Sequence, residues 1–152
     1  METLFIEKMS QRDIDEVQSI DSSSPYHSPW SKKVWVEESQ NPLSHCFVAK
    51  KRGQENPDKP IGFICFRILG EESELLNIGV HPKERLKGIG KKLMHFYIHY
   101  CKERGVKSFF LEVSVKNLPA FHLYQTFQYQ IIGTRKKFYS GEVDALLMRR
   151  SA

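Results

Sequence analysis

The residues with the clearest chemical meaning form a short glycine-containing stretch between a strand-like and a helix-like segment. Residues 85–90 read Arg-Leu-Lys-Gly-Ile-Gly, and Lys91 and Lys92 follow directly. A helix N-terminus presents unpaired backbone N–H groups and a partial positive charge, which together attract phosphate. Glycine lets the backbone approach a ligand closely and adopt a positive φ where a turn requires it. The stretch therefore predicts a loop that binds a pyrophosphate group.

Neither of the two common nucleotide-binding loops fits this stretch. A Rossmann loop has a third glycine three positions after its second, and Leu93 stands at that position here. A P-loop has serine or threonine after its Gly-Lys pair, whereas Lys92 follows Gly90 and Lys91. The pyrophosphate prediction must therefore rest on another kind of loop.

A carboxylate inside an apolar segment is the first candidate for catalysis. Glu112 lies within residues 108–114, Ser-Phe-Phe-Leu-Glu-Val-Ser, where a charged residue is unusual. If its side chain faces a cleft, loss of water makes it a stronger base, suited to take a proton from an amine. The alternative is a structural carboxylate that points to solvent or pairs with a lysine.

A tyrosine on the following segment is the candidate acid. Tyr124 lies within residues 117–127, which are predicted to form a helix with Asn117 as its cap and Pro119 in its first turn. A phenol with an ordinary pKa of about 10 stays protonated at neutral pH and can donate to a departing thiolate. The structural alternative for Tyr124 is packing on the helix face, and the cap alone is a complete structural reason for Asn117.

The segments that must position these residues alternate between strand and helix patterns. Strands are expected at 3–8, 45–50, 60–69, 74–80 and 107–114, with two more between 129 and 149 around a turn at 139–142. Helices are expected at 11–20, at 31–39, from 89 to the glycine at 105, and at 117–127. This order predicts a mixed α/β domain.

Length and composition bound the class of protein. The 152 residues, 40% of them hydrophobic, suit one folded domain over 1–152. Lys and Arg number 23 against 18 Asp and Glu, giving a net charge of +5 with both signs interspersed. No long basic run occurs, so direct nucleic-acid binding is not expected.

Cysteine usage and hydropathy indicate the compartment. Cys46, Cys65 and Cys101 are odd in number, far apart and set among apolar residues, which predicts free thiols rather than disulfides or a zinc site. No stretch has the apolar length of a signal peptide or a membrane span. The sequence therefore predicts a cytoplasmic protein without a metal cofactor.

The stretch 85–90 resembles the Arg/Gln-x-x-Gly-x-Gly/Ala signature of the GCN5-related N-acetyltransferases (GNAT) at every defined position. The preceding Asn-Ile-Gly-Val-His-Pro at 77–82 resembles the strand that leads into that family's loop, and the resemblance covers essentially the whole chain. It implies the GNAT fold of the α/β class, with a central mixed, twisted sheet of about seven strands flanked by four helices. It also implies that strands four and five splay apart and that acetyl-CoA is the co-substrate.

A narrower resemblance is to the RimI-type branch, which acetylates ribosomal proteins. It rests on Leu-Glu-Val at 111–113, Asn117, Leu-Tyr at 123–124, Phe-Tyr at 138–139, Asp-Ala-Leu-Leu-Met at 144–148 and Pro-Trp-Ser at 29–31. The chain departs from family members in having Gln128 and Tyr129 where they often have Gly-Phe, so the local path there is expected to differ.

The resemblance implies a role for each site residue. Glu112 is implied as proton acceptor and Tyr124 as proton donor. The implied acetyl-CoA contacts are Ile78, Gly79, Val80, Arg85, Leu86, Lys87, Gly88, Ile89, Gly90, Lys91, Asn117 and Tyr124. Within this set, the backbone of Ile78 and Val80 pairs with the pantetheine arm, and the amides of 86–91 hold the pyrophosphate.

The acceptor implied by the RimI-type resemblance is the α-amine of the N-terminal alanine of a small-subunit ribosomal protein, the eighteenth. Two alternatives stay open at the level of sequence. One is acetylation of a small amine such as a polyamine or aminoglycoside, and the other is a non-catalytic CoA-binding module. A monomer or a homodimer is expected for all three readings.

Overall fold

The computed structural model describes residues 3–53, 58–139 and 143–152, and for 137–139 it describes the backbone alone. The strands are β1 Thr3–Lys8, β2 Ser44–Arg52, β3 Gly62–Leu69, β4 Glu72–Val80, β5 Ser108–Ser114, β6 Gln130–Tyr139 and β7 Val143–Ser151. The α-helices are α1 Ile14–Ser22, α2 Lys32–Gln40, α3 Ile89–Lys102 and α4 Leu118–Thr126. Two 3-10 turns, η1 Gln11–Asp13 and η2 Pro82–Glu84, complete the order. The central residues of the turn predicted at 139–142 lie outside the described ranges.

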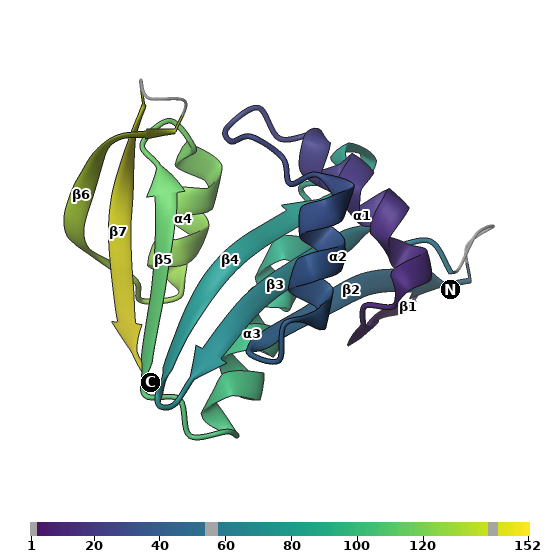
Figure 1. Cartoon of the computed structure of the whole chain (residues 1–152), viewed down its shortest axis with the longest axis horizontal. Helices are drawn as coiled ribbons and strands as arrows, with labels where there is room; N and C mark the ends of the chain where they lie inside the picture. Colours follow the sequence, from purple (N-terminus) through teal and green to yellow (C-terminus); the bar gives the residue numbers. More distant parts are fainter. Residues whose placement is uncertain (1–2, 54–57, 140–142) are drawn as a thin grey trace.

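The strands form one seven-stranded sheet in the order β1-β2-β3-β4-β5-β7-β6. Every neighbouring pair is antiparallel except β4 and β5, which are parallel. Helices α1 and α2 cover one face and α3 and α4 cover the other (Figure 1). The predicted mixed sheet of about seven strands with four flanking helices is therefore confirmed.

Two apolar clusters hold the layers together, one on each face of the sheet. The larger joins α3 and α4 to the sheet through fully buried side chains that include Leu93, Tyr97 and Phe109. The smaller joins α1 and α2 to β2 and β3 around Trp35 and Phe63, whose rings meet edge to face with centroids 5.1 Å apart. The sheet is therefore rigid, and the loops that follow its strands are positioned against it.

The parallel contact between β4 and β5 is very short. Glu72, Ser73 and Glu74 pair with Ser108, Phe109 and Phe110, and no further pair forms in the described residues of these two strands. Beyond this point the two strands diverge toward the carboxyl end of β4 (Figure 1). The splaying of strands four and five that the resemblance implied is therefore confirmed.

An irregularity in β4 decides which of its side chains face this divergence. Cys65 of β3 pairs with Asn77, but the next residue, Phe66, pairs with Leu75, so Leu76 is an extra residue in a β-bulge. The bulge shifts the alternation of side chains along the strand. As a result Leu75 packs in the cluster with α3, whereas the Asn77 side chain reaches α1 on the opposite face.

The junction between α4 and β6 follows the path that a glycine would take. Gln128 has φ 63°, in the left-handed region that favours glycine. The departure from the family's Gly-Phe therefore leaves a non-glycine residue in a conformation that is unfavourable for its side chain.

Gly79→Ala tests how tightly β4 is packed just after the bulge. A Cβ atom at Gly79 would lie 2.6 Å from Cε2 and 2.9 Å from Cζ of the fully buried Phe63. Because the added Cβ forces the Phe63 ring out of its packed position, the substitution is expected to lower the free energy of unfolding by about 1–3 kcal/mol. Urea denaturation measures the change.

Gly133→Ala is the matched control, because its added Cβ would meet Leu147 at an ordinary 3.5 Å. It is expected to change the free energy of unfolding by roughly 0.5 kcal/mol or less. Equal denaturation midpoints for the two variants would contradict the close packing of Phe63 on Gly79.

Candidate active site

The loop between β4 and α3 presents its backbone rather than its side chains. Leu86 has φ 64° and a fully exposed side chain, and Gly88 has φ 80° as the N-terminal cap of α3. A non-glycine residue in the left-handed region is strained, and such residues are common in ligand-binding loops. The first N–H groups of α3, at Ile89, Gly90 and Lys91, have no acceptor inside the helix. The geometry fits the predicted anion-binding loop.

The basic side chains around this loop divide into two groups. Arg85 folds back, donating from Nε to the Val80 carbonyl at 3.2 Å and from its guanidinium to Ser23 Oγ at 3.1 Å. It therefore fixes the loop to β4 and to the end of α1. Lys91 and Lys92 are exposed beside the helix N-terminus and are free to face an anion.

Glu84 restrains the two lysines that flank the loop on its other side. Its carboxylate lies 2.5 Å from the Lys51 ammonium and 3.2 Å from that of Lys87. Hydrogen bonding to Lys51 is the main reason that the pKa of Glu84 lies below its usual range. The loop is thus held by charge on both sides while its amides stay available.

A cavity of about 300 Å³ joins this loop to the start of α4. The predicted cofactor residues that line it come from both halves of the chain and are Ile78, Gly79, Val80, Arg85, Gly90 and Asn117. Asn117 Oδ1 also accepts from the Ala120 N–H at 3.2 Å, so the predicted helix cap is confirmed. Sequence positions forty residues apart therefore meet across the divergence of β4 and β5.

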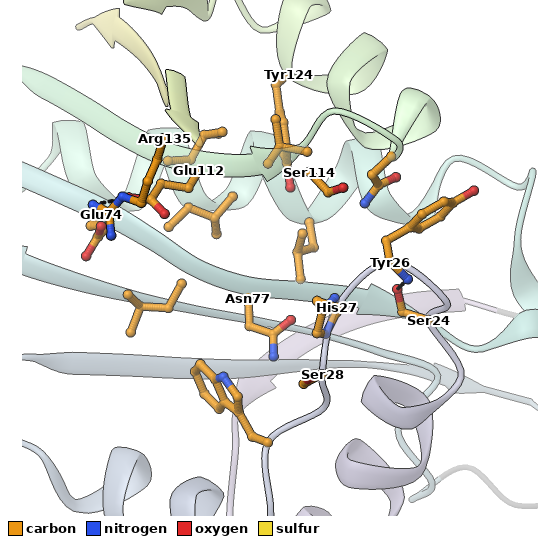
Figure 2. A pocket seen from close by; sticks show the side chains of 17 residues that line it. Ser24, Tyr26, His27, Ser28, Glu74, Asn77, Glu112, Ser114, Tyr124 and Arg135 are labelled. Carbon is orange, nitrogen blue, oxygen red and sulfur yellow. Dashed lines mark hydrogen bonds and ion pairs between the residues drawn. The ribbon is translucent and has the colours of Figure 1, made fainter. Parts of the chain in front are cut away.

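A larger cavity of about 590 Å³ adjoins this one, and Asn117 lines both. Glu112 from β5 and Tyr124 from α4 line it together, and the Tyr124 hydroxyl points into it (Figure 2). The loop between α1 and α2 forms the opposite wall through Tyr26, His27 and Trp30. The two residues predicted for proton transfer are therefore brought to one cavity.

Glu112 is partly buried and paired with a cation. Its side chain is 20% exposed, and a carboxylate oxygen lies 2.8 Å from the Arg135 guanidinium of β6. The sequence alternatives were solvent or a lysine partner, and the structure supplies an arginine instead. The charge-assisted contact fixes the carboxylate in the cavity wall.

Glu74 is a second carboxylate in the same wall, and sequence reasoning missed it. It lies at the last paired position of β4 and lines the cavity with Glu112. Burial raises the pKa of Glu74, and the nearby charge of Glu112 adds to the rise. Its position next to the turn at 70–73 reads as solvent-facing, so no signal in the sequence marks it.

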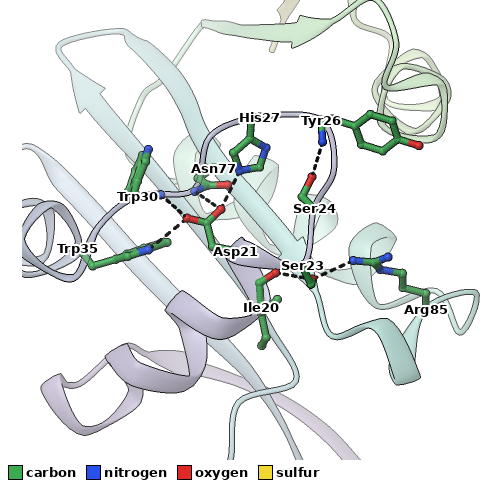
Figure 3. Close-up of polar contacts among 10 residues, drawn as sticks. All are labelled: Ile20, Asp21, Ser23, Ser24, Tyr26, His27, Trp30, Trp35, Asn77 and Arg85. Carbon is green, nitrogen blue, oxygen red and sulfur yellow. Dashed lines mark hydrogen bonds and ion pairs between the residues drawn. The ribbon is translucent and has the colours of Figure 1, made fainter. Parts of the chain in front are cut away.

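Asp21 organises the loop between α1 and α2 (Figure 3). It is 1% exposed and contacts His27 Nε2 at 2.7 Å, while its other oxygen accepts from the Trp30 N–H at 2.9 Å and from Trp35 Nε1 at 3.3 Å. Asn77 Nδ2 of β4 donates to it at 3.2 Å. A buried carboxylate needs such partners, and these tie the loop to the bulged strand.

This network was also missed, since residues 21–29 read as a polar Ser/Pro-rich loop. The signal that was present is Trp30, an aromatic residue that directly follows that polar segment. Because the partners of Asp21 come from three separate segments, the α1–α2 loop, α2 and β4, their meeting depends on the tertiary fold.

Histidine, cysteine and acidic side chains elsewhere in the described ranges have other surroundings. In the part of the chain that the structure describes, no group of three or more His, Cys, Asp or Glu side chains could hold a metal ion. His99 pairs with Glu103 at 3.0 Å, and His95 meets the Phe127 ring. None of the described helices is long and apolar enough to cross a membrane.

The chain is similar to known acetyltransferases in sequence. The model of the acetyltransferase (GNAT) family matches residues 12–129. A Bacillus subtilis relative with the provisional name of ribosomal protein bS18-alanine N-acetyltransferase is 35% identical over 146 residues, covering 94% of this chain and 92% of its own.

Two solved structures share the fold. The ribosomal-protein-S18-alanine N-acetyltransferase from Escherichia coli has a TM-score of 0.87 at 25% identity, covering 98% of this chain and 94% of its own. Arabidopsis thaliana NAA60 in complex with acetyl-CoA has a TM-score of 0.85 at 18% identity, covering 98% of each chain. With its glycine loop at the head of α3 and a sheet that splays beside it, the chain belongs to the acetyltransferase (GNAT) family.

Proposed function

We propose that this protein transfers the acetyl group of acetyl-CoA to the α-amine of the N-terminal alanine of ribosomal protein bS18. The observation that carries the proposal is that the cavity at the glycine loop adjoins the cavity lined by Glu112 and Tyr124, where β4 and β5 diverge. The names of the Bacillus subtilis and Escherichia coli relatives support this acceptor.

The proposed cofactor path follows the smaller cavity. The amides of 86–91 hold the pyrophosphate at the start of α3, where the helix supplies unpaired donors and a positive dipole end. After Glu74, the edge of β4 that faces β5 has no partner strand among the described residues. Backbone groups of Ile78 and Val80 on that edge pair with the pantetheine amides as an added strand would. Asn117 completes the contact from α4.

The proposed chemistry is direct attack of the amine on the thioester. The amine nitrogen bonds to the carbonyl carbon while the carbon–sulfur bond breaks, and a main-chain N–H at the end of β4, at Val80, stabilises the charge on the oxygen. Glu112 takes the proton that leaves the amine, and Tyr124 gives a proton to the departing thiolate. Both residues lie in the wall of one cavity, as this division of roles requires.

An α-amine suits this site better than a lysine side chain. The ordinary pKa of an α-amine is about 8 and that of lysine is about 10.4. Removing the proton from lysine at a given pH therefore costs about 3 kcal/mol more, at 1.36 kcal/mol for each pKa unit. A single carboxylate base is therefore better suited to an α-amine, which loses its proton at the smaller free-energy cost.

Three expectations from the sequence stay predictions beside this proposal. They are a single domain over 1–152, a monomer or homodimer, and a cytoplasmic location.

Glu112→Gln and Tyr124→Phe test the proton transfers. Each is expected to lower kcat by about 100-fold or more, because general acid–base catalysis contributes that much. The affinity for acetyl-CoA, measured by calorimetric titration, is expected to change little for Glu112→Gln. Glu103→Gln and Tyr100→Phe, which lie outside both cavities, are the matched controls. If both variants release thiol at the wild-type rate with a bS18 peptide that starts with alanine, neither Glu112 nor Tyr124 transfers a proton in the reaction.

Gly88→Ala tests the cofactor loop. The left-handed conformation costs a residue with a Cβ about 1–2 kcal/mol, so the affinity for acetyl-CoA is expected to fall by about 5- to 30-fold. Gly105→Ala carries the same strain at the far end of α3, and an added Cβ has open space at both positions. Calorimetric titration should show weakened binding for the first variant alone. Equal affinities would place the pyrophosphate elsewhere.

Asp21→Asn tests the wall formed by the α1–α2 loop. The amide can accept at one oxygen only and turns an N–H₂ group toward donors, so the free energy of unfolding is expected to fall by about 1–3 kcal/mol. The acceptor KM is expected to rise by roughly tenfold, which would correspond to about 1.4 kcal/mol of lost binding. Asp15→Asn, at an exposed ion pair with Lys32, is the control. An unchanged KM would mean that the loop does not position the acceptor.

A further inference from the structure

Glu74 is an exposed carboxylate in the wall of the acceptor cavity, the cavity of about 590 Å³ that Glu112 and Tyr124 also line. Glu112 in the same wall pairs with Arg135 at 2.8 Å. Arg67, the other nearby cation, is held by two hydrogen bonds of 2.7 and 2.8 Å to Glu38. Among the described residues the Glu74 side chain makes neither a hydrogen bond nor an ion pair, and its charge is influenced at longer range by Glu112, Arg67 and Arg135.

The register of the sheet places Glu74 at a defined separation from the proposed base. Glu74 pairs with Phe110, and Glu112 lies two residues further along β5 on the same face. One strand spacing and two residues of rise separate the Cα atoms by about 8 Å. An amine held at Glu112 therefore leaves Glu74 within reach of a long side chain on the next residue of the acceptor.

The cavity continues past Glu74 into an apolar space. A third cavity of about 460 Å³ shares Glu74, Leu111 and Glu112 with the acceptor cavity. The rest of its lining is largely apolar and includes Leu43, Leu69, Phe110, Ile132, Leu147 and Met148. Leu69 and Ile132 are 67% and 57% exposed, so this space opens to solvent. An extended chain whose first residue sits at Glu112 has room to leave the site by this route.

Two arginines near Glu74 favour its ionised form without contacting its carboxylate. Burial and the charge of Glu112 both disfavour the ionised form of Glu74, which is why its pKa is raised. A cation placed beside Glu74 relieves both effects. The two arginines do not supply this charge at contact distance, because each pairs with another carboxylate.

We propose that Glu74 selects acceptors whose second residue carries a positive charge, with the apolar cavity beyond it receiving the residues that follow. The inference rests on the proposed function, since it needs a peptide N-terminus as acceptor. Glu74 acts in this proposal as a specificity residue and takes no part in the transfer of protons.

A charge-swap experiment tests the selection. Three peptides that start with alanine and differ only in a second residue of lysine, glutamine or glutamate are acetylated, and kcat/KM is measured by thiol release. The wild type is expected to prefer lysine over glutamine by about tenfold and to use glutamate least, since contacts to charged groups are of this strength. Glu74→Gln is expected to flatten the order, and Glu74→Lys to reverse it.

Glu71→Lys is the matched control, because Glu71 is an exposed carboxylate paired with Lys107 and lies outside the three cavities. It is expected to keep the wild-type order. A reversal cannot come from partial unfolding, which lowers all three rates together.

Each other outcome has a separate meaning. If the wild type acetylates all three peptides equally, or if Glu74→Lys lowers all three rates by one factor, the selection by Glu74 is wrong and the proposed function stands. If the wild type acetylates none of the three or the bS18 peptide, the proposed function itself is wrong.

Discussion

The site depends on one constraint: β4 and β5 are neighbours in the sheet but pair over three residues only. Where they part, β4 loses its partner on one edge, and a strand edge with free N–H and C=O groups readily pairs with another chain. In this protein the free edge lies between the glycine loop and Glu112. A ligand with amides of its own, such as pantetheine, can therefore occupy the place that a strand would otherwise take.

Polar contacts on both faces of the sheet hold the divergence in place. At its closed end Ser73 Oγ donates to the Arg67 carbonyl and accepts from the Tyr97 hydroxyl, both at 2.7 Å. Burial raises the pKa of Tyr97, so the phenol remains a donor. At the open end Asp21 ties the α1–α2 loop to Asn77 on the bulged part of β4. Satisfied buried networks of this kind specify a single arrangement, because any displacement leaves a polar group unpaired.

In the proposed function, acetyl-CoA and the acceptor amine are bound by different parts of the protein. The cofactor side is built from backbone: a helix N-terminus, a left-handed Gly88 and the edge of a strand. Such groups are compatible with many side chains, so a site built from them depends little on particular side chains. The acceptor side is built from side chains on separate elements, including Glu74, Glu112 and Tyr124. Differences in function within a shared fold are expected on that side.

The order of elements, the glycine loop, the cap at Asn117 and the candidacy of Glu112 and Tyr124 could be read from the sequence, and the family resemblance implied the sheet of about seven strands. These follow from local periodicity, from backbone conformations that need glycine, and from a motif confined to six neighbouring residues. Only the tertiary structure decided the bulge at Leu76, the burial of Asp21 and the pairing of Glu112 with Arg135. Each of these depends on contacts between segments far apart in the chain, and a local pattern carries no information about which partner a side chain will meet.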